Sequence, residues 1–234
     1  MDIEQVVEQA WVAPDVLAVH RGYVAVIVGA TDLRPGASTD HSEALLRQAE
    51  VVTSQLLDGR EPQDLPEIQA WREAYLSFGV KPREARSSVE ALIRRIGAGL
   101  PRIDRLTDVY NAISVLHLTP LGGEDLRGYQ GPARLVIADG TESFDTMADG
   151  EPVTHLASPG EVVWRDDLGI TCRRWNWRQC VRTRLSQGTT DALFIIDALG
   201  QDSLARAEMT ATALIENLSV DSPAARFSRR TIPG

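Results

Sequence analysis

The sequence DVYNAISVLHLTPLGGEDL, from Asp108 to Leu126, contains the main change of pattern in the chain. Residues 108–118 carry apolar side chains at helical spacing, and Thr119-Pro120 ends the predicted helix because proline cannot continue it. Most of the chain before this stretch also has helical patterns. After it, short apolar runs are broken by Gly, Pro and Asp, which is typical of strands. The stretch therefore joins a helical part to a β-rich part.

The elements predicted on either side of this stretch indicate the fold class. Residues 15–30 predict two short strands around a turn at Arg21-Gly22. We predict helices over residues 40–57, 65–78, 87–96 and 202–218, the third opened by a capping box of Ser87 and Glu90. We predict further strands over residues 134–138, 161–165, 181–185 and 192–198. This order is that of an α+β fold, without the regular alternation of a doubly wound sheet.

The same pattern divides the chain into three parts. We expect residues 1–98 to form an N-terminal β-hairpin and helical part that packs on the rest. Residues 99–220 would form the core with its closing helix, and residues 221–234 a frayed C-terminal tail.

Composition and charge exclude several classes of protein. The chain has 234 residues, of which 43% are hydrophobic, enough for a core and too many for a disordered chain. Its net charge of -9 disfavours unselective binding to nucleic acid or to anionic membranes. Two segments are basic, however: residues 71–105, and residues 165–186 with six Arg against two Asp. Local contact with one docked end of a nucleic acid therefore remains compatible with the charge pattern, whereas sliding along DNA does not.

The sequence also predicts the cellular setting. The acidic start of the chain lacks the pattern of a signal peptide, and no apolar run approaches the ~18 residues of a membrane span. Cys172 and Cys180 have no metal-ligand spacing, and the four His are scattered. We expect a cytoplasmic protein with reduced thiols and with neither a metal nor a cofactor. No dinucleotide, phosphate-loop or nucleophile-elbow motif occurs.

The most unusual segment is TCRRWNWRQ, residues 171–179. As an extended strand it would place Arg174, Asn176 and Arg178 on one side, with Trp175 and Trp177 on the other. Such a strand could pair with phosphate oxygens through Arg and stack a base on Trp. The alternative is structural: both Trp lie in the core while the Arg heads reach solvent or pair with nearby aspartates.

A second group of polar residues surrounds the opening stretch. Asn111 and Ser114 share one face of the predicted helix, and Glu124 and Asp125 follow an expected Gly122-Gly123 turn. Glu142 and Glu161 are isolated acids farther along. Asp125 could be a helix or turn cap instead of a base, and Glu142 and Glu161 are each more typical of a surface charge than of a catalyst.

Four motifs give the chain a family resemblance. They are Asp108-Val109-Tyr110-Asn111, the segment from Thr119 to Leu126, Gly160-Glu161-Val162-Val163-Trp164 and Thr189-Thr190-Asp191-Ala192. Residues 100–198 resemble the B3/B4 module of the bacterial phenylalanyl-tRNA synthetase β subunit, which is its tRNA-editing domain. The whole chain resembles stand-alone relatives of that module, and the segment from Cys172 to Arg178 is typical of those relatives.

The resemblance implies a fold, an activity and a pocket. The fold would be a single B3/B4-like domain with mixed β-sheets in a sandwich-like core flanked by helices. In the synthetase, the module hydrolyses tyrosine wrongly esterified to phenylalanine tRNA. Where that pocket has its histidine this chain has Gly122, and where it has its glutamate this chain has Arg178, while Thr190 matches the second Thr of a Thr-Thr pair. An Arg can only donate hydrogen bonds, so the pocket would suit an anionic or carbonyl-rich group.

Two functions follow from this resemblance. The first is trans-editing, in which the protein hydrolyses the ester of a mischarged tRNA; the second is non-catalytic binding of a tRNA or an amino-acid-like ligand. A small-molecule enzyme that reuses the pocket is a third possibility. The candidate catalytic residues are Asp125, Glu161 and Arg178, with Glu142 or the tRNA's terminal ribose hydroxyl as other bases. The candidate substrate-binding residues are Asn111, Ser114, Gly122, Gly123, Arg174, Trp175, Asn176 and Thr190.

Overall fold

A four-stranded antiparallel sheet forms the middle layer of the molecule, whose computed structural model describes residues 2–148 and 150–234. Its strands run in the order β11 (Arg226–Pro233), β2 (Val24–Thr31), β10 (Ala192–Ala198) and β3 (Leu121–Asp125). Every residue of β2 and β10 is buried, so both faces of the sheet are covered. The side chains of these strands are almost all apolar for that reason, and Asp197 in β10 is an exception.

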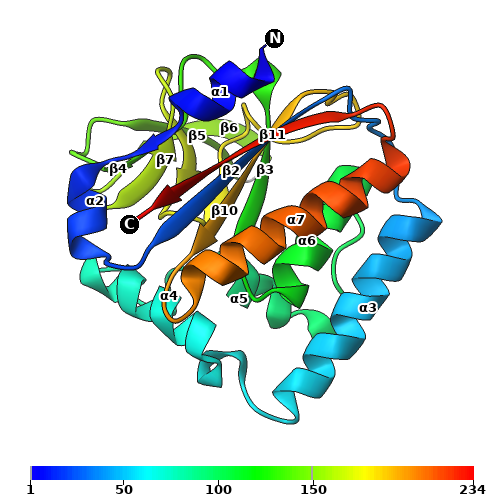
Figure 1. Cartoon of the computed structure of the whole chain (residues 1–234). Helices are drawn as coiled ribbons and strands as arrows, with labels where there is room; N and C mark the ends of the chain where they lie inside the picture. The colour runs from blue at the N-terminus through cyan, green and yellow to red at the C-terminus, as the bar shows by residue number, and fades with distance from the viewer. Residues whose placement is uncertain (1, 149) are drawn as a thin grey trace.

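Helices lie against both faces of the central sheet, those after residue 200 on one face and the first helix of the chain on the other (Figure 1). The helices are α1 (Ile3–Gln9), α2 (Pro14–Val19), α3 (Asp40–Leu57), α4 (Pro66–Ser77), α5 (Ser88–Ile93), α6 (Arg105–Leu116) and α7 (Ser203–Asp221), with short 3-10 turns at Pro62–Asp64, Ile96–Ala98 and Leu126–Gly128. α6 and α7 pack on the sheet, and α3 packs on α6. Val26 and Phe194 point from the sheet into this apolar core.

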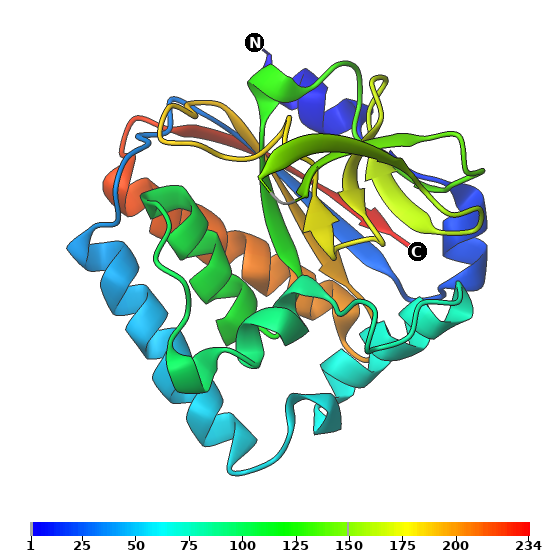
Figure 2. The ribbon, with the colours of Figure 1, turned by 180° about the vertical axis from the view of Figure 1, so that it is seen from behind.

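A second, five-stranded sheet lies across the other face of the central sheet (Figure 2). Its strands run in the order β1 (Trp11–Val12), β4 (Arg134–Ile137), β7 (Val162–Arg165), β8 (Ile170–Arg173) and β9 (Arg178–Gln179). β1 is parallel to β4 and the other pairs are antiparallel. Ile27 and Ile195 of the central sheet pack in one core with Leu135 and Trp164 of this sheet. The predicted α+β class with mixed sheets is thereby confirmed.

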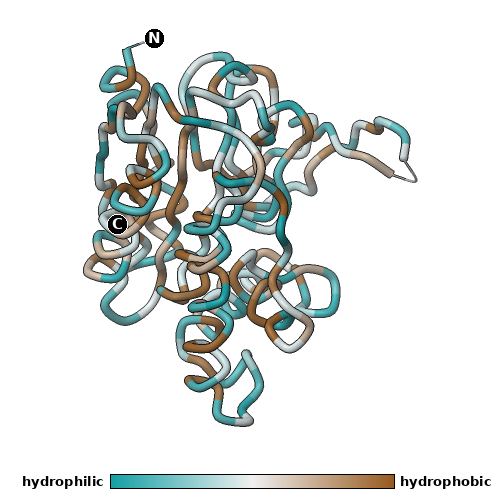
Figure 3. The backbone as a smooth tube through the Cα atoms, turned by 90° about the vertical axis from the view of Figure 1, so that its right-hand side faces the viewer, coloured by the Kyte–Doolittle hydropathy of each residue, from teal (hydrophilic) through white to brown (hydrophobic). Residues whose placement is uncertain are grey.

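A hairpin of β5 (Ser143–Ala148) and β6 (Glu151–Leu156) extends away from the body of the molecule (Figure 3). Only its base is anchored: Phe144 is fully buried, whereas most side chains of β6 are exposed. The hairpin lies outside the layers that hold the cavity described below.

Most helix predictions are confirmed, because α3 to α7 match the amphipathic segments. The predicted capping box at α5 is only half formed. The Ser87 hydroxyl accepts the Glu90 backbone N–H at 3.4 Å, but the Glu90 carboxylate binds Arg72 and Arg94 instead of turning back to the cap. Two guanidinium groups bind a buried carboxylate more strongly than one backbone N–H does.

Two predictions at the chain's ends are wrong. Residues 15–30 form helix α2 and strand β2, not a hairpin, because Pro14 at the first helical position has the backbone angle that opens a helix. Residues 226–233, predicted as a frayed tail, form the edge strand β11, which pairs with β2 along its whole length. Main-chain hydrogen bonds hold this strand, and its half-exposed side chains show little apolar periodicity.

Two predictions in the β-rich half are also wrong. Residues 181–185 form turns with one isolated bridge, between Glu124 and Arg184, instead of a strand. Gly122-Gly123, expected as a turn, lies within strand β3. A Cβ at Gly123 would come within 2.8 Å of side-chain atoms of Leu185 and Phe194. Glycine is therefore needed here for close packing and not for a turn.

Candidate functional site

A cavity of about 240 Å³ lies between the two sheets and the helices α5 and α6. Cavities that hold drug-sized ligands measure roughly 300–1,000 Å³, so this cavity suits a smaller group, of the size of an amino acid. Its lining side chains belong to Ser88, Ala91, Leu92, Arg95, Tyr110, Asn111, Leu121, Gly122, Glu124, Trp164, Cys172, Trp175, Asn176, Trp177, Arg178, Gln179, Ile195 and Asp197.

The register of β3 against β10 places two carboxyl groups in this cavity. Glu124 lies opposite Leu193, and Gly122 lies opposite Ile195. Side chains at alternate positions of a strand share a face, so Leu193, Ile195 and Asp197 point the same way as Glu124. Asp197 lies four positions after Leu193, which is ~13 Å at the usual rise of a strand. The two acids therefore line distant parts of one cavity.

Glu124 is a buried carboxyl group with unusual acidity. Burial raises its pKa from 4.5 to about 7, against the opposing effect of hydrogen bonds that include one from the Tyr129 hydroxyl. The same hydroxyl lies 3.4 Å from Thr171 Oγ1. A carboxyl group with a pKa near neutrality exchanges protons readily at physiological pH, which is the property of a general acid or base.

Asp197 is the second buried carboxyl group. Its Oδ1 accepts the Tyr23 hydroxyl at 2.6 Å and the Trp164 Nε1–H at 3.2 Å, and its Oδ2 accepts Asn176 Nδ2–H at 3.4 Å. Burial raises its pKa to about 6 despite these donors, so it carries a charge at neutral pH. Tyr75 donates to Asn176 Oδ1 at 2.9 Å, which fixes the orientation of that amide.

Neither carboxyl group has a cationic partner among residues 2–148 and 150–234. The ion pairs among the described residues join other acids to Arg. Cys172 lines the cavity between the two acids, and burial raises the pKa of its thiol, an effect to which both acids add. A thiol that stays protonated is a poor nucleophile. The reactive groups of the cavity are therefore its carboxyl groups.

The segment from Arg174 to Trp177 is a tight turn and not the predicted extended strand. Arg174 and Trp175 adopt left-handed backbone angles, with φ of 48° and 65°. Such angles strain residues other than glycine, and packing must hold them in place. Trp175 is fully buried and meets His20, Tyr23 and Trp71 edge-on. The turn thus drives Trp175 and Asn176 inward, whereas a strand would have placed them on opposite sides.

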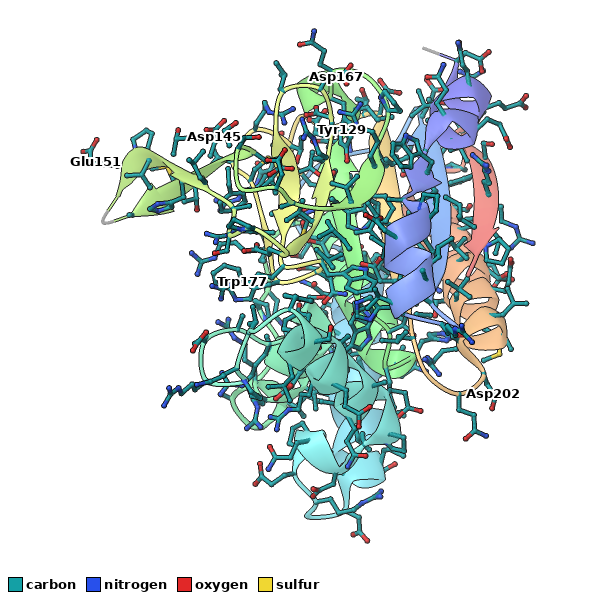
Figure 4. The ribbon with its side chains drawn as sticks, turned by 90° about the vertical axis from the view of Figure 1, so that its left-hand side faces the viewer. Tyr129, Asp145, Glu151, Asp167, Trp177 and Asp202 are labelled. Atoms are coloured by element: carbon teal, nitrogen blue, oxygen red, sulfur yellow. The ribbon has the colours of Figure 1, made fainter. Side chains whose placement is uncertain are left out.

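Trp177 lies at the outer rim, at the level where the strands meet the helices (Figure 4). The guanidinium carbons of Arg174 and Arg178 lie 4.6 and 4.5 Å from its ring centroid, within the range of cation–π contacts. Arg178 and Arg95 line the cavity and are exposed. In the described parts of the chain, Arg95, Arg174 and Arg178 join no ion pair, so the rim holds positive charge for an anionic group.

Five residues predicted for the site meet at the cavity: Asn111, Gly122, Trp175, Asn176 and Arg178. They come from α6, β3, the turn before β9 and β9 itself. Only the fold brings together side chains that lie as far as 67 positions apart, from 111 to 178.

The predicted bases lie elsewhere. Asp125 accepts Arg127 and the Thr189 hydroxyl, at 2.7 Å each, and caps a 3-10 turn. Glu161 accepts two bonds from the Arg173 guanidinium, at 2.9 and 3.0 Å. Glu142 caps its own loop and lies 3.6 Å from Arg165. Each of these carboxylates has structural partners and does not line the cavity.

Four predicted substrate-binding residues also lie outside the cavity lining. The Ser114 hydroxyl donates to the Thr119 carbonyl at 2.6 Å, which closes the end of α6. Thr190 is exposed and bonds Asp191. Gly123 packs against side chains, and Arg174 lies beside Trp177. The structure therefore does not join these four to the cavity.

Sequence reasoning missed the two carboxyl groups that do line the cavity. The sequence contained one signal for Asp197, which interrupts the apolar run Ala192–Ala198. Because an aspartate is rarely buried without a specific role, an acid inside a buried strand indicates a candidate site. Glu124 was named only as the residue after an expected turn. Without the strand there was no face on which to place it.

Comparisons with known proteins found a family model and a similar solved structure. Residues 70–227 match the model of the B3/4 domain family. A similar solved structure is an N-terminal fragment of the phenylalanyl-tRNA synthetase β-subunit from Pyrococcus horikoshii, 13% identical, with a TM-score of 0.45. The alignment covers 97% of this chain and 54% of that one, so the chain spans about half the length of the fragment. Among curated proteins, none matches the chain.

The described residues contain neither a helix that could span a membrane nor a group of side chains that could bind a metal ion. No helix there combines the length and the apolar character needed to cross a membrane. No three His, Cys, Asp or Glu side chains in the same ranges are grouped so that they could hold a metal ion.

Because the family model spans most of the sequence, from α4 to β11, the chain belongs to the B3/4 domain family.

Proposed function

We propose that the protein hydrolyses the ester bond of a mischarged tRNA, with the aminoacyl group in the cavity between the sheets. The observation that carries this proposal is the buried carboxyl group of Glu124, whose pKa of about 7 suits it to take a proton from water. Such a general base contributes roughly 10² to 10⁴ in rate. Binding of RNA and a place in the cytoplasm belong to the same proposal.

The rim supports the binding of a polyanion. Arg95 and Arg178 are exposed at the cavity without a carboxylate partner among the described residues. The guanidinium groups that lie over the Trp177 ring can donate to the phosphate of a tRNA acceptor end. The terminal nucleotide would lie at the rim, and its ester would point inward. Glu124 replaces Asp125, Glu161 and Glu142 as the proposed base, because those three are held in structural contacts.

The test is deacylation of a panel of mischarged tRNAs by the purified protein. We expect at least one tRNA to lose its amino acid faster than in buffer, and E124Q to abolish this activity. E142Q is the matched control, since it makes the same exchange at a buried glutamate outside the cavity lining. Absence of deacylation across the panel, or equal loss in both variants, would refute the proposal.

A second function, binding without catalysis, has one observation in its favour. Asp197 is a buried carboxylate without a cationic side-chain partner among the described residues, and binding an amine there requires no reaction. Under this alternative the protein binds a tRNA or an amino-acid-like ligand with saturation and without turnover. Measurements of binding and deacylation on the same samples separate the two functions.

A further inference from the structure

Asp197 has an acceptor position that no described group of the protein fills. Its Oδ1 accepts hydrogen bonds of 2.6 and 3.2 Å, whereas its Oδ2 accepts only the 3.4 Å bond from Asn176. A carboxylate offers about four lone-pair positions, so the Oδ2 side remains incomplete. That side meets Asn176, which itself lines the cavity. The open position therefore lies where a ligand can reach it.

Among the described residues, no positively charged group pairs with Asp197, although its surroundings favour one. Buried charges in proteins are normally paired, yet no described Arg, Lys or His pairs with this carboxylate. His20 is nearby, in contact with Trp175, but burial lowers its pKa and keeps it neutral. Trp164 and Trp175 line the same cavity, and the faces of aromatic rings attract cations. A cationic ligand group would supply the missing charge.

The indole N–H of Trp175, close to Asp197, indicates which chemical group lies beside the cation in the ligand. The indole N–H of Trp175 is buried and has no partner in hydrogen-bond geometry, although it lies near enough to Asp197 to lower the pKa of that carboxyl. A buried donor without a partner is unfavourable unless a ligand supplies an acceptor. A carbonyl oxygen beside an ammonium group meets both needs, and these two groups are adjacent in an α-aminoacyl group.

We propose that Asp197 binds the α-ammonium group of the aminoacyl ligand and that the Trp175 indole N–H donates to its carbonyl oxygen. This inference deepens the proposed function and rests on it for the identity of the ester. It assigns the chemical class of the ligand: a free, protonated primary amine next to a carbonyl group. Ligands with an acylated amine are excluded, because an amide nitrogen carries no charge to pair with Asp197.

The test uses ligands that bind without hydrolysis of an ester. The twenty L-amino acid amides, which keep the ammonium and the carbonyl, are compared with their N-acetyl derivatives by calorimetric titration of the full-length protein. We expect at least one amide to bind, and its N-acetyl derivative to bind at least roughly tenfold more weakly. D197N should lose this preference. D108N is the matched control, because Asp108 is also buried but does not line the cavity.

Two outcomes would overturn the inference: equal affinity for an amide and its N-acetyl derivative, or no binding by any amide. Both are measured on the unmodified protein, so they stand even if D197N does not fold. They are also separate from the proposed function. Amide binding without deacylation would refute hydrolysis and keep the ammonium site, and deacylation without amide binding would do the reverse.

Discussion

Replacing Glu124 with glutamine should make the protein more stable at alkaline pH while removing the ester hydrolysis proposed above. The folded-state pKa of about 7 lies above the ordinary 4.5, so the folded protein binds this proton more tightly than the unfolded chain does. The stabilisation from the protonated carboxyl is complete below pH 4.5 and is lost as the pH rises through about 7.

The size of this effect follows from the two pKa values. A difference between 4.5 and about 7 corresponds to about 3 kcal/mol of unfolding free energy between acidic and alkaline pH, at 1.36 kcal/mol per pKa unit. Glutamine has nearly the same shape, keeps an oxygen that can accept from Tyr129 and carries no charge. E124Q should therefore exceed the natural protein in stability by up to about 3 kcal/mol at pH 8.5, or ~6–12 °C in Tm.

The assay is urea unfolding of both proteins at pH 5 and pH 8.5, followed by fluorescence. We expect similar unfolding free energies at pH 5 and a gain for E124Q at pH 8.5. E84Q is the control: Glu84 is exposed, and surface exchanges usually change stability by less than ~0.5 kcal/mol. If E124Q were no more stable than the natural protein at pH 8.5, the reasoning that this carboxyl is desolvated would be refuted.

Three other changes test separate parts of the structure. R178E should weaken tRNA binding and flatten its salt dependence, because a repulsive charge replaces a rim cation; unchanged affinity in filter binding would contradict the rim assignment. G29A should lower stability by ~1–3 kcal/mol in urea unfolding, since its Cβ would lie 2.7 Å from Ile3; an unchanged midpoint would show that helix α1 moves freely. D166A should cost ~3–5 kcal/mol because it leaves Arg182 half-buried and unpaired, and a loss below ~1 kcal/mol in the same assay would contradict this.

Under the proposed function, one cavity combines recognition of the ligand with its hydrolysis. Asp197 is held by hydrogen-bond donors on one side and is charged at neutral pH, whereas Glu124 shares its proton with the solvent at the same pH. The two carboxyl groups thus differ in role because their surroundings differ, although both lie on one face of one sheet. The high pKa of Cys172 keeps a thiol between them from competing as a nucleophile.

Local sequence determined the helices and the family motifs. Apolar residues at helical spacing and capping residues such as Thr39 and Asp104 act within a few positions, so α3, α4, α6 and α7 could be predicted within a few residues of their bounds. The interruption of an apolar strand by Asp197 was also visible. The division of the chain after residue 98 stays a prediction.

Only the tertiary structure decided the cavity and its chemistry. Glu124 and Asp197 share a face because β3 and β10 pair in one register, although more than 70 positions separate them in sequence. The left-handed turn at Arg174 and Trp175 exists because packing on His20, Tyr23 and Trp71 holds it. The pKa of a carboxyl group depends on the water that packing removes, and no local pattern of residues encodes that removal.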